Sequence, residues 1–234
     1  MDFSALVGMP FRAASAMRRA RVFHPDGVVF RGEVRRVAPD GHGLPLQSGD
    51  VLARLSKGIG LPFGLPDIGG LAFRRFGRSP DEQDWDVLLA GSGSGIVGRM
   101  IPWPARSWGT TEFSTLMPLQ YDGRSWWLRA VATESPTGAM NVENARDALF
   151  SNRMEFRIDQ ACGPDDFVPL AYLRPTGPSG ISDAQVGFDS VRNSHPQVRP
   201  APEWLRAVRQ SAYRNSREGR PTDALPRPTP PRPF

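Results

Sequence analysis

The sequence predicts a mainly β protein with a few helices, of the α+β class, in which antiparallel strands form a barrel or a sandwich. Seven segments alternate apolar and polar residues and are rich in β-branched and aromatic side chains. Glycine and proline, 24 of each, separate these segments and indicate turns. Helical spacing of apolar residues is confined to the two ends of the chain.

The expected elements follow one another with turn residues between them. A short helix is expected near residues 13–20, before the first strand. The predicted strands cover residues 28–34, 51–56, 71–76, 85–89, 126–133, 154–159 and 168–173. Residues 61–66 and 91–95 have the composition of loops. The second of these lacks the Gly-Lys-Ser/Thr ending of a phosphate-binding loop, so a flexible connection is expected there.

The last part of the chain changes from strands to a helix and then to a tail. After Pro202, apolar residues recur at helical spacing up to Ala212, and Gly219 ends the run. Residues 221–234 alternate proline with arginine and polar residues, a composition that cannot form a core. We therefore expect one domain over residues 1–220 and a disordered tail over residues 221–234.

Composition excludes several classes of protein. No run approaches the roughly 20 apolar residues of a membrane span, and the N-terminus lacks the layout of a secretory signal, so a cytoplasmic protein is expected. Cys162 is the only cysteine, which rules out an intrachain disulfide and a thiolate metal cluster. The net charge of +5 comes from scattered arginines without a basic stripe, and nucleic-acid binding is not expected.

Arg209 and Tyr213 lie four residues apart on the late helix and so share one face. A tyrosine that binds iron must lose its proton, although its ordinary pKa is about 10. A neighbouring guanidinium favours the phenolate, because its charge is permanent and its forked donors can bond the oxygen. The same spacing also fits a surface helix on which the arginine stacks against the tyrosine.

Near the other end of the chain, His24 precedes a turn signature. Histidine titrates near neutrality and can move a proton, but a structural histidine also fits this place. In the second predicted strand, the period of two places Arg54 and Ser56 on one face. An anion-binding side chain and a hydroxyl therefore point the same way.

Other ionisable residues are expected to be structural. His42 and His195 lie among glycine and proline in loop-like sequence and are given no role. Asp26, Asp67 and Asp86 are expected at turns and strand ends, rather than together in an acidic metal site.

Several short motifs occur in one order along most of the chain. They are Arg21-Val22-Phe23-His24-Pro25-Asp26-Gly27 followed by Arg31-Gly32-Glu33-Val34, then Ala53-Arg54-Leu55-Ser56, residues 66–74, Trp85-Asp86-Val87-Leu88, Phe188-Asp189 with Pro196, and Arg209 with Tyr213. In this order they resemble the haem catalase superfamily, in particular its compact catalase-like bacterial members. The resemblance implies a catalase-like antiparallel β-barrel with a C-terminal helix that carries the haem ligand.

The resemblance implies roles for residues on the two faces of a haem. His24 would be the distal acid and base, Ser56 would hydrogen-bond to it and fix its tautomer, and Phe23 would pack over the ring. Arg21 and His24 are three residues apart, so both can serve one haem only where the strand bulges or ends, which Pro25 makes possible.

On the proximal face, the resemblance makes Tyr213 the axial iron ligand and Arg209 the cation that stabilises its phenolate. Arg21 and Arg54 would contact the haem propionates. The implied cofactor is haem b, and the metal is its iron.

The chain also departs from the family pattern. Catalases carry an asparagine after the Trp-Asp strand that helps to hold peroxide, whereas residues 89–92 contain none. Ser92 is the candidate substitute as a donor. Gly69 stands where the family has an arginine. The chain is shorter than typical catalases, so the subunit-interlocking arm and the NADPH-binding domain are expected to be absent.

These observations lead to two functional hypotheses. The first is a haem b enzyme that reacts with hydrogen peroxide or organic hydroperoxides, as a peroxidase or a hydroperoxide-processing enzyme rather than an efficient catalase. The second is a diverged haem carrier or sensor without turnover, which the missing asparagine motivates. A haem-free barrel that binds another anionic ligand through its arginines is a third alternative. The expected partners are a peroxide and an organic small molecule, and a homo-oligomer stays open.

Overall fold

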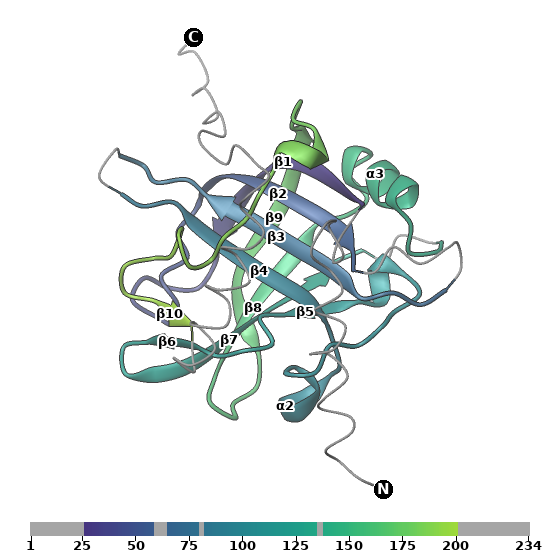
Figure 1. The fold of residues 1–234 in the computed structure, drawn as a ribbon. Helices are drawn as coiled ribbons and strands as arrows, with labels where there is room; N and C mark the ends of the chain where they lie inside the picture. The colour runs from purple at the N-terminus through teal and green to yellow at the C-terminus, as the bar shows by residue number, and fades with distance from the viewer. Residues whose placement is uncertain (1–25, 59–64, 80–81, 135–137, 201–234) are drawn as a thin grey trace, which may run out of the picture.

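The computed structural model describes residues 26–58, 65–79, 82–134 and 138–200, which fold into strands with short helical elements (Figure 1). The strands are β1 (Gly27–Arg36), β2 (Gly49–Lys57), β3 (Gly69–Arg75), β4 (Trp85–Ser92), β5 (Glu112–Ser114), β6 (Leu119–Tyr121), β7 (Arg124–Ala132), β8 (Phe156–Cys162), β9 (Val168–Pro178) and β10 (Arg199–Pro200). The helical elements are α2 (Gly95–Gly98), α3 (Val142–Phe150) and the 3-10 turns η1 (Trp108–Thr110) and η2 (Asp183–Gln185). The predicted fold class, mainly β with a few helices, is confirmed.

Some predicted elements cannot be compared with the structure. The helix at 13–20, most of the loop at 61–66, the helix after Pro202 and the tail at 221–234 lie outside the described residues. The division into a domain and a tail therefore stays a prediction. In the part of the chain that is described, no helix has the length and the apolar character needed to cross a membrane.

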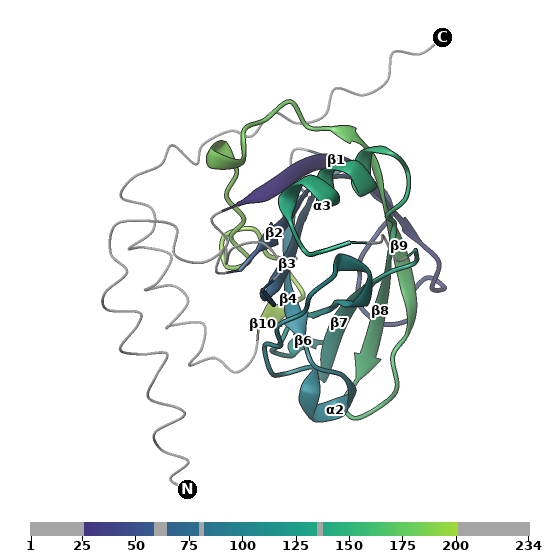
Figure 2. The same cartoon turned by 90° about the vertical axis from the view of Figure 1, so that its right-hand side faces the viewer.

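Eight of the strands close into an antiparallel barrel. Neighbours around it follow the order β7-β5-β4-β3-β2-β1-β9-β8, and β8 pairs again with β7 to complete the ring (Figure 2). β6 lengthens the sheet at the edge of β7, and β10 pairs with β6. Closure gives the long barrel strands partners on both sides, so their backbone groups are hydrogen-bonded without a free edge.

The barrel interior is an apolar core to which every barrel strand contributes. Its largest fully buried side chains include Phe30, Phe73, Phe113, Leu128 and Phe156, from β1, β3, β5, β7 and β8. Side chains alternate between this core and the outside of the barrel, as the period of two requires. The seven predicted strands coincide with β1 to β4 and β7 to β9.

Among the elements that were not predicted from the sequence are three short strands and the helix α3. β5, β6 and β10 are two or three residues long, which is too short for a period of two to stand out. α3 buries only Ala145, Ala148 and Leu149 of its nine residues, so its apolar stripe is narrow. It begins after Asn141, whose side-chain Oδ1 accepts a hydrogen bond from the backbone N–H of Asn144 at 2.7 Å.

A strap formed by residues 181–195 runs along the outside of the barrel. Val186 packs with Val29 and Leu52, and Ile181 and Phe188 contact the same small apolar cluster. The strap therefore covers part of the outward face of β1 to β3, which explains why residues on both faces of β2 are buried.

The glycine-rich segment 91–95, predicted to be a flexible loop, is mostly ordered structure. β4 continues to Ser92, and α2 begins at Gly95. A Cβ atom on Gly98 would lie 2.8 Å from the carbonyl carbon of Gly93, so these two glycines allow a close backbone approach. The loop is therefore shorter than predicted, since only residues 93 and 94 connect β4 to α2.

Candidate functional site

The outward-facing residues of β1 to β4 form rows across the barrel wall. The antiparallel registers place Ser56 between Gly27 of β1 and Gly70 of β3, and place Gly70 opposite Ala90 of β4. None of these side chains is larger than that of serine. The row is therefore a flat strip of sheet, which we call the small-residue platform (Gly27, Ser56, Gly70 and Ala90).

The neighbouring row contains the arginine that was predicted to share a face with Ser56. Arg54 lies opposite Val29 on one side and Ala72 on the other, two residues before Ser56 on the regular strand β2. The shared face of Arg54 and Ser56 is confirmed. A cation and a hydroxyl thus border a flat surface of small side chains.

Ser56 is 4% exposed, and its Oγ donates a hydrogen bond to the carbonyl oxygen of Gly70 at 3.3 Å. A hydroxyl that donates one hydrogen bond still has oxygen lone pairs that accept others. A serine hydroxyl thus has the chemistry that pairing with an imidazole requires.

The guanidinium of Arg54 is held by Asp183 at the start of η2. Nε donates to Oδ1 of Asp183, and Nη2 donates to Oδ2 at 2.9 Å. A Cβ atom on Gly27 would lie 2.8 Å from Cζ of Arg54, so the glycine leaves room for the guanidinium. A carboxylate ligand of Arg54 would share this cation with Asp183.

A second ion pair is buried between β3 and β4, one row further along the same face. Arg74 donates from Nε and Nη2 to the two carboxylate oxygens of Asp86, at 2.6 and 2.7 Å. The backbone N–H of Asp189 and the side-chain amide of Asn193 also donate to Asp86, at 2.7 and 2.9 Å. Burial lowers the pKa of Arg74, but the hydrogen bond and charge of Asp86 outweigh it and raise that pKa. This pair ties the strap to the barrel.

Ser92, the predicted substitute for the distal asparagine, lies at the end of β4, two residues beyond Ala90. It is 8% exposed, and its Oγ donates to the backbone carbonyl of Glu112 at 3.4 Å. Its hydroxyl is thus directed to β5 in this structure. A catalytic role for Ser92 stays a prediction.

Packing explains why position 69 is a glycine and not the arginine of the catalase pattern. A Cβ atom there would lie 2.9 Å from Cε1 of Phe113 and 3.3 Å from Cζ3 of Trp108. Both rings are fully or almost fully buried in the core. The space that a side chain would need is therefore filled by aromatic rings.

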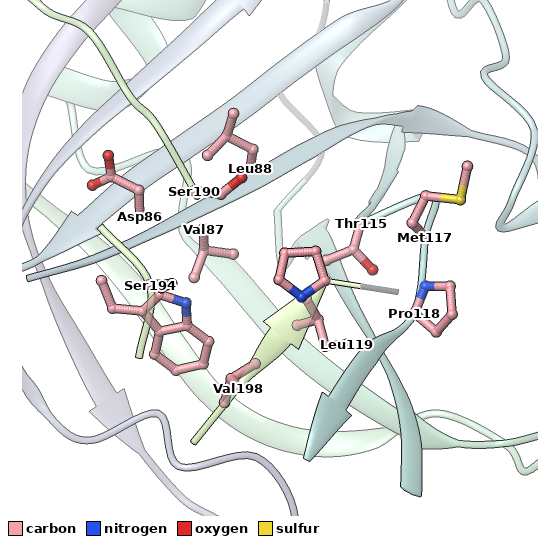
Figure 3. Close-up of a pocket in the computed structure, with 12 residues that line it drawn as sticks. Asp86, Val87, Leu88, Thr115, Met117, Pro118, Leu119, Ser190, Ser194 and Val198 are labelled. Carbon is pink, nitrogen blue, oxygen red and sulfur yellow. The ribbon is translucent and has the colours of Figure 1, made fainter. Parts of the chain in front are cut away.

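Two cavities lie near the outward face. The first has a volume of about 30 Å³ and is bordered by the start of β4 and by residues around Thr115 and Ser190 (Figure 3). Oγ1 of Thr115 and Oγ of Ser190 are buried without a hydrogen-bond partner in the described part of the chain. A cavity of this size is far too small for a macrocycle.

The second cavity, of about 260 Å³, lies between β1, α3 and η2. Gly27 and Asp183 are among its lining residues, which places it beside the Arg54 ion pair and one end of the small-residue platform. Arg146 and Phe150 of α3 border its other side. It is large enough for a small organic molecule.

The predicted haem-contacting residues at the ends of the chain lie outside the described residues. These are Arg21, Phe23 and His24 near the N-terminus and Arg209 and Tyr213 near the C-terminus. Asp26, the first described residue, directly precedes Gly27 of the small-residue platform. Along the chain, His24 is therefore three residues from the platform.

Comparison with solved structures identifies the architecture. A bacterial catalase, a fungal catalase and catalase A from Saccharomyces cerevisiae match 92%, 93% and 92% of this chain, with TM-scores of 0.60, 0.63 and 0.60. The chain has the catalase-like fold. Sequence identity to these three catalases is 12%, 10% and 8%, so the likeness is one of fold.

This chain spans 60%, 62% and 64% of the length of the three catalases. No family model and no curated protein matches the sequence. The resemblance drawn from the motifs is thus supported at the level of the fold.

Sequence reasoning missed two features of the site. The pairing of Arg54 with Asp183 joins residues far apart in the chain, and no local pattern indicates it. The sequence did contain a signal for the small-residue platform, because the period of two in β2, β3 and β4 determines which residues face outward. The register between strands, which aligns Ser56, Gly70 and Ala90, was needed to see it.

Proposed function

We propose that this chain binds haem b against the small-residue platform and reacts with peroxides, as a peroxidase or a hydroperoxide-processing enzyme. The observation that carries the proposal is the platform itself, a flat outward-facing strip in a catalase-like barrel with Ser56 on it and Arg54 beside it. A planar macrocycle needs such a flat surface, whereas a bulky side chain at Gly70 or Ala90 would stand in its way. The small side chains of this row and the neighbouring Arg54 are what support the proposal.

In this proposal the haem is held from both ends of the chain. Tyr213 would hold the iron as a phenolate, and Arg209, four residues earlier in the sequence, would stabilise the phenolate charge. Arg54 and Arg21 would hold the propionates, and Phe23 would contact the ring. When bound, the haem supplies the redox chemistry by which the peroxide O–O bond is cleaved.

The protein's own contribution is to move a proton. His24 would accept a proton from the bound hydroperoxide and return it to the oxygen that leaves as water or an alcohol, while the haem would supply the electrons for O–O cleavage. Ser56 accepts the imidazole N–H that faces the barrel, so that the opposite ring nitrogen of His24 is the basic one. The position of Ser56 within the platform supports this role.

The described residues favour organic hydroperoxides over efficient hydrogen peroxide dismutation. Ala90 gives the platform no polar donor on β4, and the hydroxyl of Ser92 bonds to Glu112. The second cavity, beside Arg54, offers room for an organic group. The same lack of a donor at Ala90 favours, as a second candidate, a haem carrier or sensor without turnover.

The visible absorption spectrum of the purified full chain tests the cofactor. We expect a Soret band, and we expect Tyr213→Phe to lose or shift it because the phenolate ligand is gone. Tyr172→Phe, which changes a tyrosine on β9 that contacts Arg35, is the matched control and should keep the native spectrum. A Tyr213→Phe protein with an unchanged haem spectrum would refute the ligand assignment.

Rapid mixing with peroxides separates the two candidates. An enzyme should change its visible spectrum rapidly with an organic hydroperoxide, and His24→Ala should slow that change by about 100-fold or more, the usual size of acid–base catalysis. Ser56→Ala should slow it less, because the hydroxyl acts through His24. Slow bleaching, equal in wild type and His24→Ala, would support the carrier or sensor instead.

A further inference from the structure

The segment that follows β4 has its apolar side chains outside and its charged side chain inside. Five apolar side chains of this segment are exposed, and we call them the apolar tip. They are Ile96 (55%), Val97 (63%), Met100 (42%), Ile101 (46%) and Trp103 (61%). Arg99, in the middle of the same segment, is only 3% exposed. This arrangement is the inverse of an ordinary surface segment, in which the charge faces water.

Specific contacts hold Arg99 inside. Its guanidinium lies 4.2 Å from the ring centre of Trp127 and 5.5 Å from that of Phe167. Nη2 donates a hydrogen bond to the carbonyl oxygen of Gly163. Desolvation lowers the pKa of Arg99, which reflects the free-energy cost of burying the charge. The two aromatic rings and the carbonyl offset this cost and hold the segment in one orientation.

The backbone of the tip is also fixed. The N–H of Gly93 donates to the carbonyl of Ile101 at 3.2 Å, and the N–H of Trp103 donates to the carbonyl of Gly91 at 2.9 Å. These two bonds join Ile101 and Trp103, at the C-terminal end of the tip, to the end of β4 and the residue after it. The exposure of the apolar side chains is therefore built into the folded structure.

The shape and size of the tip indicate what it contacts. In both views α2 stands out from the barrel, at the end away from α3 (Figures 1 and 2). The tip is a convex projection of five apolar residues, whereas a stable protein interface usually takes about 20–30 residues from each side. A lipid surface needs no complementary groove, and a few apolar side chains with a tryptophan are typical of segments that enter the headgroup region.

We propose that the apolar tip docks this protein onto a lipid bilayer by inserting between the headgroups and the upper acyl chains. Arg99 is the only charged residue from 94 to 105, and its burial leaves the inserting surface without an exposed charge. Asp165 and Asp166 lie on the turn next to Phe167 and oppose attraction to anionic lipid. Apolar insertion, more than charge, therefore carries the binding.

Flotation of the full chain with phosphatidylcholine vesicles tests the proposal. The wild-type protein should float with the vesicles, and Val97→Asp/Trp103→Asp should lower the bound-to-free ratio by at least about tenfold, because two apolar contacts with the acyl region are lost. The control is Phe150→Ser, which removes a 37%-exposed aromatic side chain from α3, at the other end of the barrel. It should bind vesicles as the wild type does.

Two further measurements distinguish loss of lipid binding from loss of folding and test whether Trp103 enters the bilayer. Thermal unfolding checks that the double variant is folded, and single substitutions Val97→Ser and Trp103→Ser replace it if it is not. Brominated acyl chains should quench tryptophan fluorescence in the wild type more than in Trp103→Ser. If the wild-type protein fails to bind vesicles, the proposal is wrong. This holds for a monomeric protein, and also if the tip instead joins copies of the chain into oligomers that the double variant dissociates.

Discussion

At the residue scale, the outward face of the barrel depends on charged side chains that are buried with their partners. The Arg74–Asp86 pair lies between β3 and β4, and Asp86 also receives hydrogen bonds from the strap. Arg54 and Asp183 join β2 to η2 in a similar way. These pairs set where the strap lies along the outside of the barrel.

Removal of Arg74 should be strongly destabilising. We expect Arg74→Met to lower the free energy of unfolding by about 3–5 kcal/mol, because the Asp86 carboxylate, which is fully buried, would lose its cation. Arg174→Met is the control, since its partner Glu155 lies 3.6 Å away and the arginine side chain is 67% exposed. It should cost no more than about 1 kcal/mol. Urea denaturation of both variants measures the difference, and equal losses would contradict a special role for the buried pair.

His195, for which no role was predicted, should make stability depend on pH. Burial and the charge of Arg75 lower its pKa below the ordinary value of about 6.5, against a smaller opposite effect of Glu82. Its ring lies 5.5 Å from that of Trp85, and Nδ1 accepts the backbone N–H of Gln197 at 3.3 Å. The folded state thus favours the neutral ring.

Between the folded and unfolded pKa values of His195, the unfolded chain binds more protons than the folded chain. The free energy of unfolding should therefore fall as the pH drops below about 6.5 and through the folded-state pKa. Urea unfolding at a series of pH values, for wild type and His195→Asn, measures this contribution. If the variant shows the same slope as the wild type in this range, His195 is not its source.

At the element scale, β3, β5 and η1 pack so closely that one position tolerates only glycine. Gly69 on β3 faces Phe113 of β5 and Trp108 of η1, and a Cβ atom would approach both rings. The sequence resemblance shows only that an arginine is missing there. The packing explains why glycine is present.

Gly69→Ala should destabilise the barrel by about 1–3 kcal/mol, because two core rings must move. The companion substitution Phe113→Leu removes part of the ring that the new methyl group meets. In a double-mutant cycle, Gly69→Ala should cost less in the Phe113→Leu background than in the wild type. Strictly additive losses in thermal or urea unfolding would show that the predicted contact does not form.

At the scale of the whole molecule, the closed barrel should unfold as one unit. Every barrel strand contributes to a single apolar core, and α3 adds Ala145, Ala148 and Leu149 to it. Far-UV circular dichroism and tryptophan fluorescence should therefore give coincident thermal transitions. Separate midpoints would show instead that part of the barrel unfolds independently.

The proposed haem site and the proposed lipid contact also belong to this scale. The small-residue platform lies on the outside of β1 to β4, whereas the apolar tip leaves the end of β4 and packs through Arg99 against Trp127 of β7. The two proposals rest on different residues, so each can fail without the other. Together they describe a barrel that could process organic hydroperoxides at a lipid surface.

The sequence by itself determined the longer strands and which side chains of β2 share one face. Alternation and turn residues are local properties, so the seven longer strands and the shared face of Arg54 and Ser56 followed from them. The ordered motifs pointed to the catalase-like barrel, which the solved catalases then supported.

Only the tertiary structure decided how the strands are aligned and what covers them. Three features join residues that are distant in the chain. They are the register that aligns Ser56, Gly70 and Ala90, the ion pair of Arg54 with Asp183, and the burial of Arg99 against Trp127. Such contacts depend on barrel closure and on which side chains find room once the core is packed. No local pattern carries that information, because the free energy of each contact is set by its neighbours in space.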